Sequence, residues 1–198
     1  MCYCTDLFLS ELCGNDYIVT GASALRLISK LEDEGILFSP DKNLAVYVAK
    51  RSGKEIIPVP PHGYCYVHEC LITRYHIEKA RDERSTAKLM VHPEVSPSNQ
   101  EMADYIGSTS QMLKAIDKSD ENLFLIGTEE ALSYRARKLY PEKEIYSVNP
   151  RAICIDMKKI NLLNIKESLE RLKHKIVIKK KVRQKIKSIL DRSLEMIK

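Results

Sequence analysis

The chain has 198 residues, of which 44% are hydrophobic and 30% charged, and its formal net charge is +5. This length and balance allow a buried core and exclude a disordered protein. The N-terminal stretch MCYCTDLFLSELCG contains Asp6 and Glu11 and lacks the basic residues of a secretory signal, and no apolar run approaches the roughly 20 residues that span a bilayer, so we expect a cytosolic protein.

Apolar periodicity and chain breakers predict alternating strands and helices along the chain. The first part predicts strand 16–19, helix 22–33, strand 35–39, helix 41–51 and strand 55–59. The middle predicts helix 72–83, strand 87–91, a short helix 97–103, strand 104–107, helix 109–118, strand 122–126, helix 129–139 and strand 144–147. The chain closes with helix 160–172 and a long basic helix from about Lys180. This alternation indicates an α/β fold with parallel strands.

An internal repeat is visible, because the sequence from Asp16 aligns without gaps with the sequence from Asp104, 88 positions later. The paired positions are Tyr17 with Tyr105, Leu25 with Leu113, Leu37 with Leu125 and Leu44 with Leu132. One added residue raises the offset to 89 and places Cys65 on Cys154. Chance matches between amphipathic units are common, but the paired cysteines favour duplication. The first copy lacks the strand and helix that precede Asp104 in the second.

We therefore expect pseudo-symmetric repeated αβα domains with short parallel sheets. The expected boundaries are a partial unit at 1–60, a complete unit at 61–150, and a C-terminal segment at 151–198 with a cysteine loop and helices. Equivalent loops around a pseudo-symmetry axis meet at a centre, so Cys65 and Cys154 are expected to meet there.

Polar residues follow three apolar runs, at 55–60, 87–91 and 103–107, which are typical of buried parallel strands. In open α/β sheets the ligand crevice lies beyond the carboxyl ends of the strands. We expect one cavity to be faced by Cys65, His92, Glu94, Ser108 and Thr109.

Six cysteines in a cytosolic protein indicate thiols or metal ligands rather than disulfides. Cys65 and Cys154 form no local metal motif, and each taken alone is typical of an inert buried thiol. The repeat favours a shared metal centre for the pair, where soft thiolates select zinc or an iron–sulfur cluster.

His92 and Glu94 flank Pro93 at the end of a predicted strand, a pattern that fits either an acid–base pair or a structural salt bridge. Ser108 and Thr109 open a helix, where hydroxyls cap backbone N–H groups and the same N–H groups bind a phosphate or carboxylate. Thr128, followed by Glu129 and Glu130, is interpreted only as a helix cap with first-turn acids.

Eight Lys or Arg residues lie between Lys173 and Lys187. This basic stretch lacks interleaved aromatic residues, so it is more typical of a solvated helix face than of a nucleic-acid-binding surface.

Together, the motifs GYCYVH, HPE, GSTSQM, LIGTEE, SPDKNLAVYVAK and CIDMKKI make the chain resemble quinolinate synthase from about Asp16 to the C-terminus. The resemblance implies three pseudo-threefold related α/β domains around a central cavity. It also implies a [4Fe-4S] cluster held by three cysteines, one per domain, with one iron open to substrate. Cys65 and Cys154 match the second and third of these cysteines.

The resemblance implies a transferase of NAD biosynthesis, since members of this family condense iminoaspartate with dihydroxyacetone phosphate to give quinolinate. By resemblance, His92 and Glu94 bind substrate and transfer protons, and Ser108 and Thr109 bind substrate carboxylate. Gly21 stands where the family usually has a substrate-binding serine, and Tyr64 stands where it usually has histidine.

The resemblance lacks the family's first domain, including the first cluster cysteine, for which Cys2, Cys4 or Cys13 is a candidate replacement. We expect a homo-oligomer or a partner chain that supplies the missing domain. The alternative function is that of a catalytically incomplete family remnant that binds a small anion or pairs with another subunit.

Overall fold

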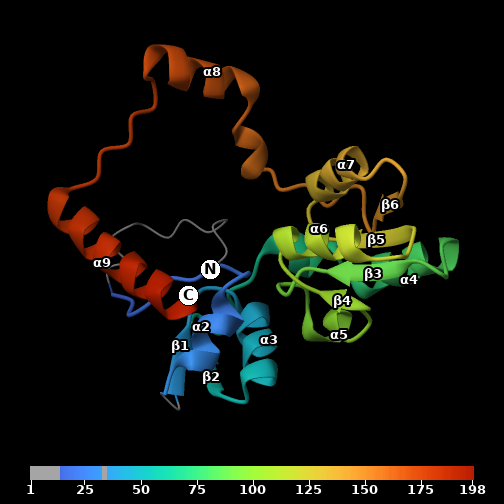
Figure 1. The fold of residues 1–198 in the computed structure, drawn as a ribbon, viewed down its shortest axis with the longest axis horizontal. Helices are drawn as coiled ribbons and strands as arrows, with labels where there is room; N and C mark the ends of the chain where they lie inside the picture. Colours follow the sequence, from blue (N-terminus) through green and yellow to red (C-terminus); the bar gives the residue numbers. More distant parts are fainter. Residues whose placement is uncertain (1–13, 33–34) are drawn as a thin grey trace.

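The computed structural model describes residues 14–32 and 35–198, which form an α/β fold with two short parallel sheets (Figure 1). The first sheet pairs β1 (Gly35–Phe38) with β2 (Glu55–Pro58), and it carries the helices α2 (Ala24–Lys30) and α3 (Lys42–Ser52). The second sheet has the order β4-β3-β5-β6, in which every pairing is parallel. The predicted fold class is confirmed.

The strands of the second sheet are β3 (Lys88–Val91), β4 (Tyr105–Ile106), β5 (Leu123–Gly127) and β6 (Glu144–Ser147). Its helices are α4 (Arg74–Glu83), α5 (Pro97–Gln100), α6 (Thr109–Lys118) and α7 (Glu130–Leu139). A π-helical turn at Val67–Leu71 precedes α4.

Helices cover both faces of the second sheet. Successive side chains of a strand point to opposite faces, so each strand contributes to two buried clusters. Leu89 and Leu125 pack with α4 in one buried cluster, whereas Met90 and Phe124 pack with α6 and α7 in another. This arrangement explains why β3 and β5 are continuous apolar runs rather than alternating patterns.

Among the described residues, helices cover the first sheet on one face only. Phe38 packs against residues of α2 and α3, such as Leu27 and Leu44, in a separate cluster. On the other face, Leu37 is 73% exposed, whereas its repeat equivalent Leu125 is fully buried. The described part of the first unit therefore corresponds to the second unit without α4 and β3, which in the second unit contribute to the buried cluster on that face.

The pairing of the strands follows the predicted repeat. β1 pairs with β2 as β5 pairs with β6, so that Leu37 lies opposite Ile57 and Leu125 lies opposite Tyr146. These positions are related by the same offsets of 88 and 89 that align the two copies.

The C-terminal segment contains a short 3-10 turn (Met157–Lys159), α8 (Leu162–Arg171) and α9 (Lys180–Ile197). α9 lies beside α2, and its Ile186 and Ile189 cover Ile18. α8 stands apart from both sheets and buries none of its residues (Figure 1). Within the described residues, no helix has both the length and the apolar character needed to cross a membrane.

The predicted strand at 16–19 is wrong. These residues are in no strand, and the N–H of Ile18 donates to Ser193 Oγ of α9 at 2.9 Å. In the second copy, the equivalent β4 pairs with β3. The described part of the first copy contains no counterpart of β3, so within that part residues 16–19 have no strand to pair with. The predicted domain boundaries at 1–60, 61–150 and 151–198 stay a prediction.

Candidate functional site

The site lies at the carboxyl edge of the second sheet. Val91 is paired with Ile106 on one side and with Gly127 on the other, so the three strands end at the same level. The next residues along each strand are His92, Gly107 and Thr128, followed closely by Glu94 and Ser108. Parallel topology thus gathers side chains from three separate loops.

A buried group of Cys65, His68 and Glu94 forms the centre of the site. One ligand-type atom from each residue lies within 4.8 Å of the other two. His68 Nδ1 is 3.0 Å from Glu94 Oε2, and both side chains are almost completely buried. A thiol, an imidazole and a carboxylate that converge in this way are chemically suited to metal binding or to proton transfer.

His68 lies between two further residues of the sheet edge. Its Nε2 is 2.8 Å from the hydroxyl of Thr128, and its ring stacks on His92 with centroids 4.4 Å apart. Burial lowers the pKa of His68, but hydrogen bonds to Cys65 and Glu94 outweigh burial and raise it to about 9. His68 is therefore an imidazolium at neutral pH.

His92 has the opposite protonation state. Burial and the neighbouring charge of His68 lower the pKa of His92 to about 3, so its ring is neutral. The backbone N–H of Glu94 donates to His92 Nδ1 at 3.4 Å, which places the proton of the neutral ring on Nε2. That nitrogen faces Gly21, where an added Cβ would lie 3.7 Å from it. Two adjacent histidines thus provide one cation and one neutral donor.

The loop that carries Cys65 is fixed by the start of α3. Asp41 Oδ1 accepts a hydrogen bond from Leu44 N at 2.8 Å and caps the helix. Its Oδ2 accepts one from Cys65 N at 2.9 Å. Burial, followed by the charge of Glu94, raises the pKa of Asp41 to about 6.

Asn43, also at the start of α3, joins the two units at the site. Its amide nitrogen donates to Glu69 Oε2 at 2.7 Å and to the backbone oxygen of Glu94 at 2.9 Å. Glu69 also forms an ion pair with Lys42 at 3.1 Å. The first unit thus contributes directly to the position of Glu94.

Cys154 belongs to the same buried cluster as Cys65, so the two cysteines do not lie in separate cores. It is not a member of the close group formed by Cys65, His68 and Glu94. Tyr66 links the two cysteine loops, because its hydroxyl accepts from Ile155 N at 2.7 Å and donates to Ile153 O at 3.3 Å. These two peptide groups flank Cys154 on both sides.

Cys154 is also held by Glu129. Its backbone N–H donates to Glu129 Oε1 at 3.3 Å, while Glu129 Oε2 accepts from Ala131 N at 2.8 Å and caps α7. Lys158 pairs with the same carboxylate at 3.1 Å. Neither Cys65, Cys70 nor Cys154 forms a disulfide. Cys2, Cys4 and Cys13 lie outside the described residues.

Ser108 and Thr109 lie at the adjacent strand end. Ser108 is buried and forms a reciprocal capping box with Gln111 at the start of α6, whereas Thr109 is exposed. The cap that their sequence indicates is present, and their role in substrate binding stays a prediction.

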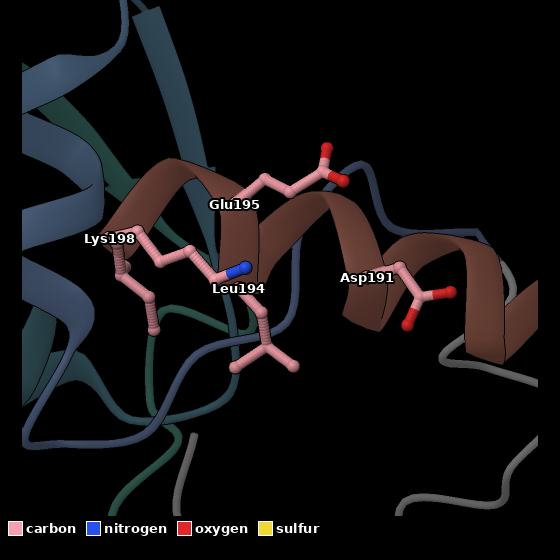
Figure 2. A pocket seen from close by; sticks show the side chains of 5 residues that line it. Asp191, Leu194, Glu195 and Lys198 are labelled. Atoms are coloured by element: carbon pink, nitrogen blue, oxygen red, sulfur yellow. The ribbon is translucent and has the colours of Figure 1, made fainter.

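Two hollows on the surface lie apart from this site, and no residue of the site lines either of them. One lies at the end of α9 (Figure 2) and is lined by Asp191, Leu194, Glu195, Ile197 and Lys198. Another lies beside β1, where residues such as Tyr17, Leu37 and Arg192 line it.

Sequence reasoning missed His68, which lies within the π-helical turn and three residues after Cys65. Such turns are frequent at functional sites, but their formation is hard to read from sequence. It also interpreted Thr128 and Glu129 only as cap residues, whereas their side chains contact His68 and the Cys154 loop.

Comparison with known proteins identifies the family of this chain. The family model described as Quinolinate synthetase A protein matches residues 9–195. A quinolinate synthase of Pyrococcus abyssi is 46% identical over 181 residues, and one of Thermotoga maritima is 35% identical over 182 residues. These alignments cover 91% and 92% of this chain and 60% of each relative, so the chain spans about 60% of their length. The chain therefore belongs to the quinolinate synthetase A family.

Proposed function

We propose that this chain carries most of a quinolinate synthase active site. Cys65 and Cys154 serve as two ligands of a [4Fe-4S] cluster, and His68, His92 and Glu94 serve as the proton-transfer centre. Gly21, Ser108 and Thr109 line the substrate site. The observations that carry this proposal are the buried convergence of Cys65, His68 and Glu94, and the position of Cys65 in one buried cluster with Cys154.

The two cysteines fit the chemistry of such a cluster. Each is almost completely buried, and each lies on a loop whose backbone N–H is bound by a carboxylate. Thiolates are the usual ligands of [4Fe-4S] clusters. Cys70 is exposed, so the described residues provide two buried thiols rather than three. When bound, the cluster supplies an open iron that acts as a Lewis acid on a hydroxyl or carboxylate of the substrate.

The proton chemistry follows from the contacts of the three side chains, because His68 Nδ1 lies 3.0 Å from Glu94 Oε2 and the ring of His68 stacks on that of His92. Glu94 accepts a proton from a carbon next to a carbonyl, and the neighbouring imidazolium of His68 returns a proton to a leaving hydroxyl. Neutral His92 donates from Nε2 to a substrate oxygen near Gly21. Burial of all three side chains limits water at the reacting atoms and strengthens these interactions.

Anaerobic reconstitution with iron and sulfide tests this function. We expect about four iron atoms per chain, the visible absorption of an iron–sulfur cluster, and quinolinate from iminoaspartate and dihydroxyacetone phosphate. Cys65→Ser and Cys154→Ser should lose iron. Cys70→Ser is the matched control, since that cysteine is exposed and should leave loading unchanged. Equal loading of all three variants would contradict the ligand assignment.

A second candidate function is that of a catalytically incomplete family member that binds a small anion or pairs with another subunit. It is favoured by the described residues, which provide two buried thiols where the proposed cluster uses three cysteines. It predicts a loaded cluster without quinolinate formation, and turnover by the purified chain would exclude it.

We also propose that a second copy or a partner chain covers the apolar surface that this chain exposes. Leu37 is 73% exposed on the open face of the first sheet, and Leu162 of α8 is 86% exposed. Exposed apolar surface of this kind marks interaction sites. Sizing at several concentrations, with and without Leu162→Asp, tests this proposal. A monomer at all concentrations, without a co-purifying partner, would contradict it.

A further inference from the structure

The two copies of the repeat share hydrogen bonds as well as strands. Three backbone bonds of the first copy recur in the second, shifted by 88 residues at one end and 89 at the other, or by 89 at both. The bond from Val59 N to Phe38 O (2.8 Å) corresponds to the bond from Val148 N to Ile126 O (3.0 Å). The bond from Lys42 N to Gly63 O (2.8 Å) corresponds to the bond from Glu130 N to Ala152 O (2.9 Å). The bond from Glu69 N to Cys65 O (2.9 Å) corresponds to the bond from Lys158 N to Cys154 O (3.1 Å). The segments that lead into and out of each cysteine are thus equivalent.

The offset of 88 that aligns the two copies also pairs two buried acids, Asp41 and Glu129. One oxygen of each carboxylate caps the following helix, α3 or α7. The other oxygen accepts the backbone N–H of the cysteine in its own copy, Cys65 or Cys154. Helix capping needs only the first of these bonds.

The second bond has a separate effect. A carboxylate that accepts a backbone N–H forms a charge-assisted hydrogen bond, which is stronger than one between neutral groups. Because it acts on the N–H of the cysteine itself, it limits rotation of the backbone that aims the sulfur. Asp41 is 1% exposed and Glu129 is 8% exposed, so water does not compete readily for either bond.

We infer that Asp41 and Glu129 are equivalent positioning residues that fix the backbones of Cys65 and Cys154 and so direct both sulfurs to one metal centre. The inference rests on the proposed role of the two cysteines as metal ligands. It assigns to each copy one acid that joins a helix start to a ligand loop.

Amide variants keep the size of the side chain but remove one of its two acceptors. In Asp41→Asn and Glu129→Gln, one oxygen becomes an NH2 group, so the single oxygen left cannot accept both the helix N–H and the cysteine N–H. Asp104→Asn is the matched control, because Asp104 Oδ2 accepts a backbone N–H from Leu89 at 2.8 Å and lies outside the two cysteine loops. Asp41→Ser keeps a helix-capping hydroxyl but is too short to hold Cys65 as well.

The first measurement is pulsed alkylation of the metal-free chain, with each cysteine read separately by mass spectrometry. We expect Asp41→Asn and Asp41→Ser to increase alkylation of Cys65 about tenfold, the effect of losing one hydrogen bond to a charged group, and to leave Cys154 unchanged. Glu129→Gln should do the reverse. Asp104→Asn should change neither. Cys70 is exposed in the folded chain, so it is labelled in every variant and calibrates the reaction, while circular dichroism reports whether a variant is globally unfolded.

The second measurement uses the reconstituted chain. Asp41→Asn and Glu129→Gln should alter the paramagnetic resonance spectrum of the reduced cluster and speed iron loss to a chelator, whereas Asp104→Asn should not. If each acid variant affects both cysteines equally, or matches Asp104→Asn, the inference is overturned. If the wild-type chain takes up no iron, the proposed function fails, while the alkylation result still decides the role of the two acids.

Discussion

The tightest backbone contact near the site predicts a large loss of stability for Gly63→Ala. An added Cβ at position 63 would lie 2.0 Å from the carbonyl oxygen of Pro40, whereas real Cβ contacts are essentially never below 3.0 Å. The loop must therefore move by about 1 Å. That movement strains the bond from Lys42 N to Gly63 O, now 2.8 Å.

Overpacking of this kind costs about 1–3 kcal/mol, and the weakened buried hydrogen bond adds about 1 kcal/mol. For a chain of this size, each kcal/mol lowers the melting temperature by about 2–4 °C, so we expect a decrease of roughly 5–15 °C. Thermal unfolding of the metal-free protein, followed by circular dichroism, measures it.

Gly35→Ala is the matched control, because no atom lies within 4 Å of an added Cβ there. That variant should melt at the wild-type temperature or slightly above it, since alanine restricts the unfolded chain more than glycine does. If Gly63→Ala is as stable as Gly35→Ala, the packing of the Cys65 loop on Pro40 is not as described.

Three further predictions concern the acid–base centre. The pKa of His68 rises from its ordinary 6.5 to about 9, so its stabilising effect is complete below pH 6.5 and is lost as the pH rises through 9. Denaturant unfolding of the metal-free chain should show the difference between wild type and His68→Gln shrinking over that range, and a constant difference would contradict it. Thr128→Val removes the hydroxyl 2.8 Å from His68 Nε2 and should cost about 1–3 kcal/mol of unfolding free energy, whereas Thr109→Val, at an exposed position, should cost little. Gly21→Ser should fold normally, since its Cβ would contact His92 at an ordinary 3.7 Å. The added hydroxyl can donate to a carboxylate, so the dicarboxylate malate should raise the melting temperature of this variant more than that of wild type. An equal shift with malate would argue against Gly21 lying in a carboxylate site.

Local pattern predicted most of the regular structure. Helix 109–118 and strand 144–147 were predicted with the bounds that the structure has, because each has a clear period and clear chain breakers. Strand 16–19 was wrong because a strand depends on a partner, which the residues themselves do not reveal. The helix predicted at 97–103 is shorter, ending at Gln100.

The site was predicted in part. The structure places Cys65 beside Glu94, His92 beside Gly21, and Cys154 in the cluster of Cys65, while the functions of these residues stay predictions. The residues that connect them could not be predicted in the same way. The contacts of Asp41, Tyr66 and Thr128 join loops that are 24 to 89 residues apart, and a capping motif looks the same whether or not its second oxygen holds another loop.

The buried amide of Asn43 has a consequence for how the protein unfolds. From α3, which packs on the first sheet, it donates to the Glu69 side chain and to the backbone oxygen of Glu94 in the second unit. Unfolding of the first sheet with its helices would therefore remove a hydrogen-bond donor from these groups of the second unit. Two sheets that could each have formed a separate folding unit are thus coupled, and loss of either should propagate to the other in a single cooperative transition.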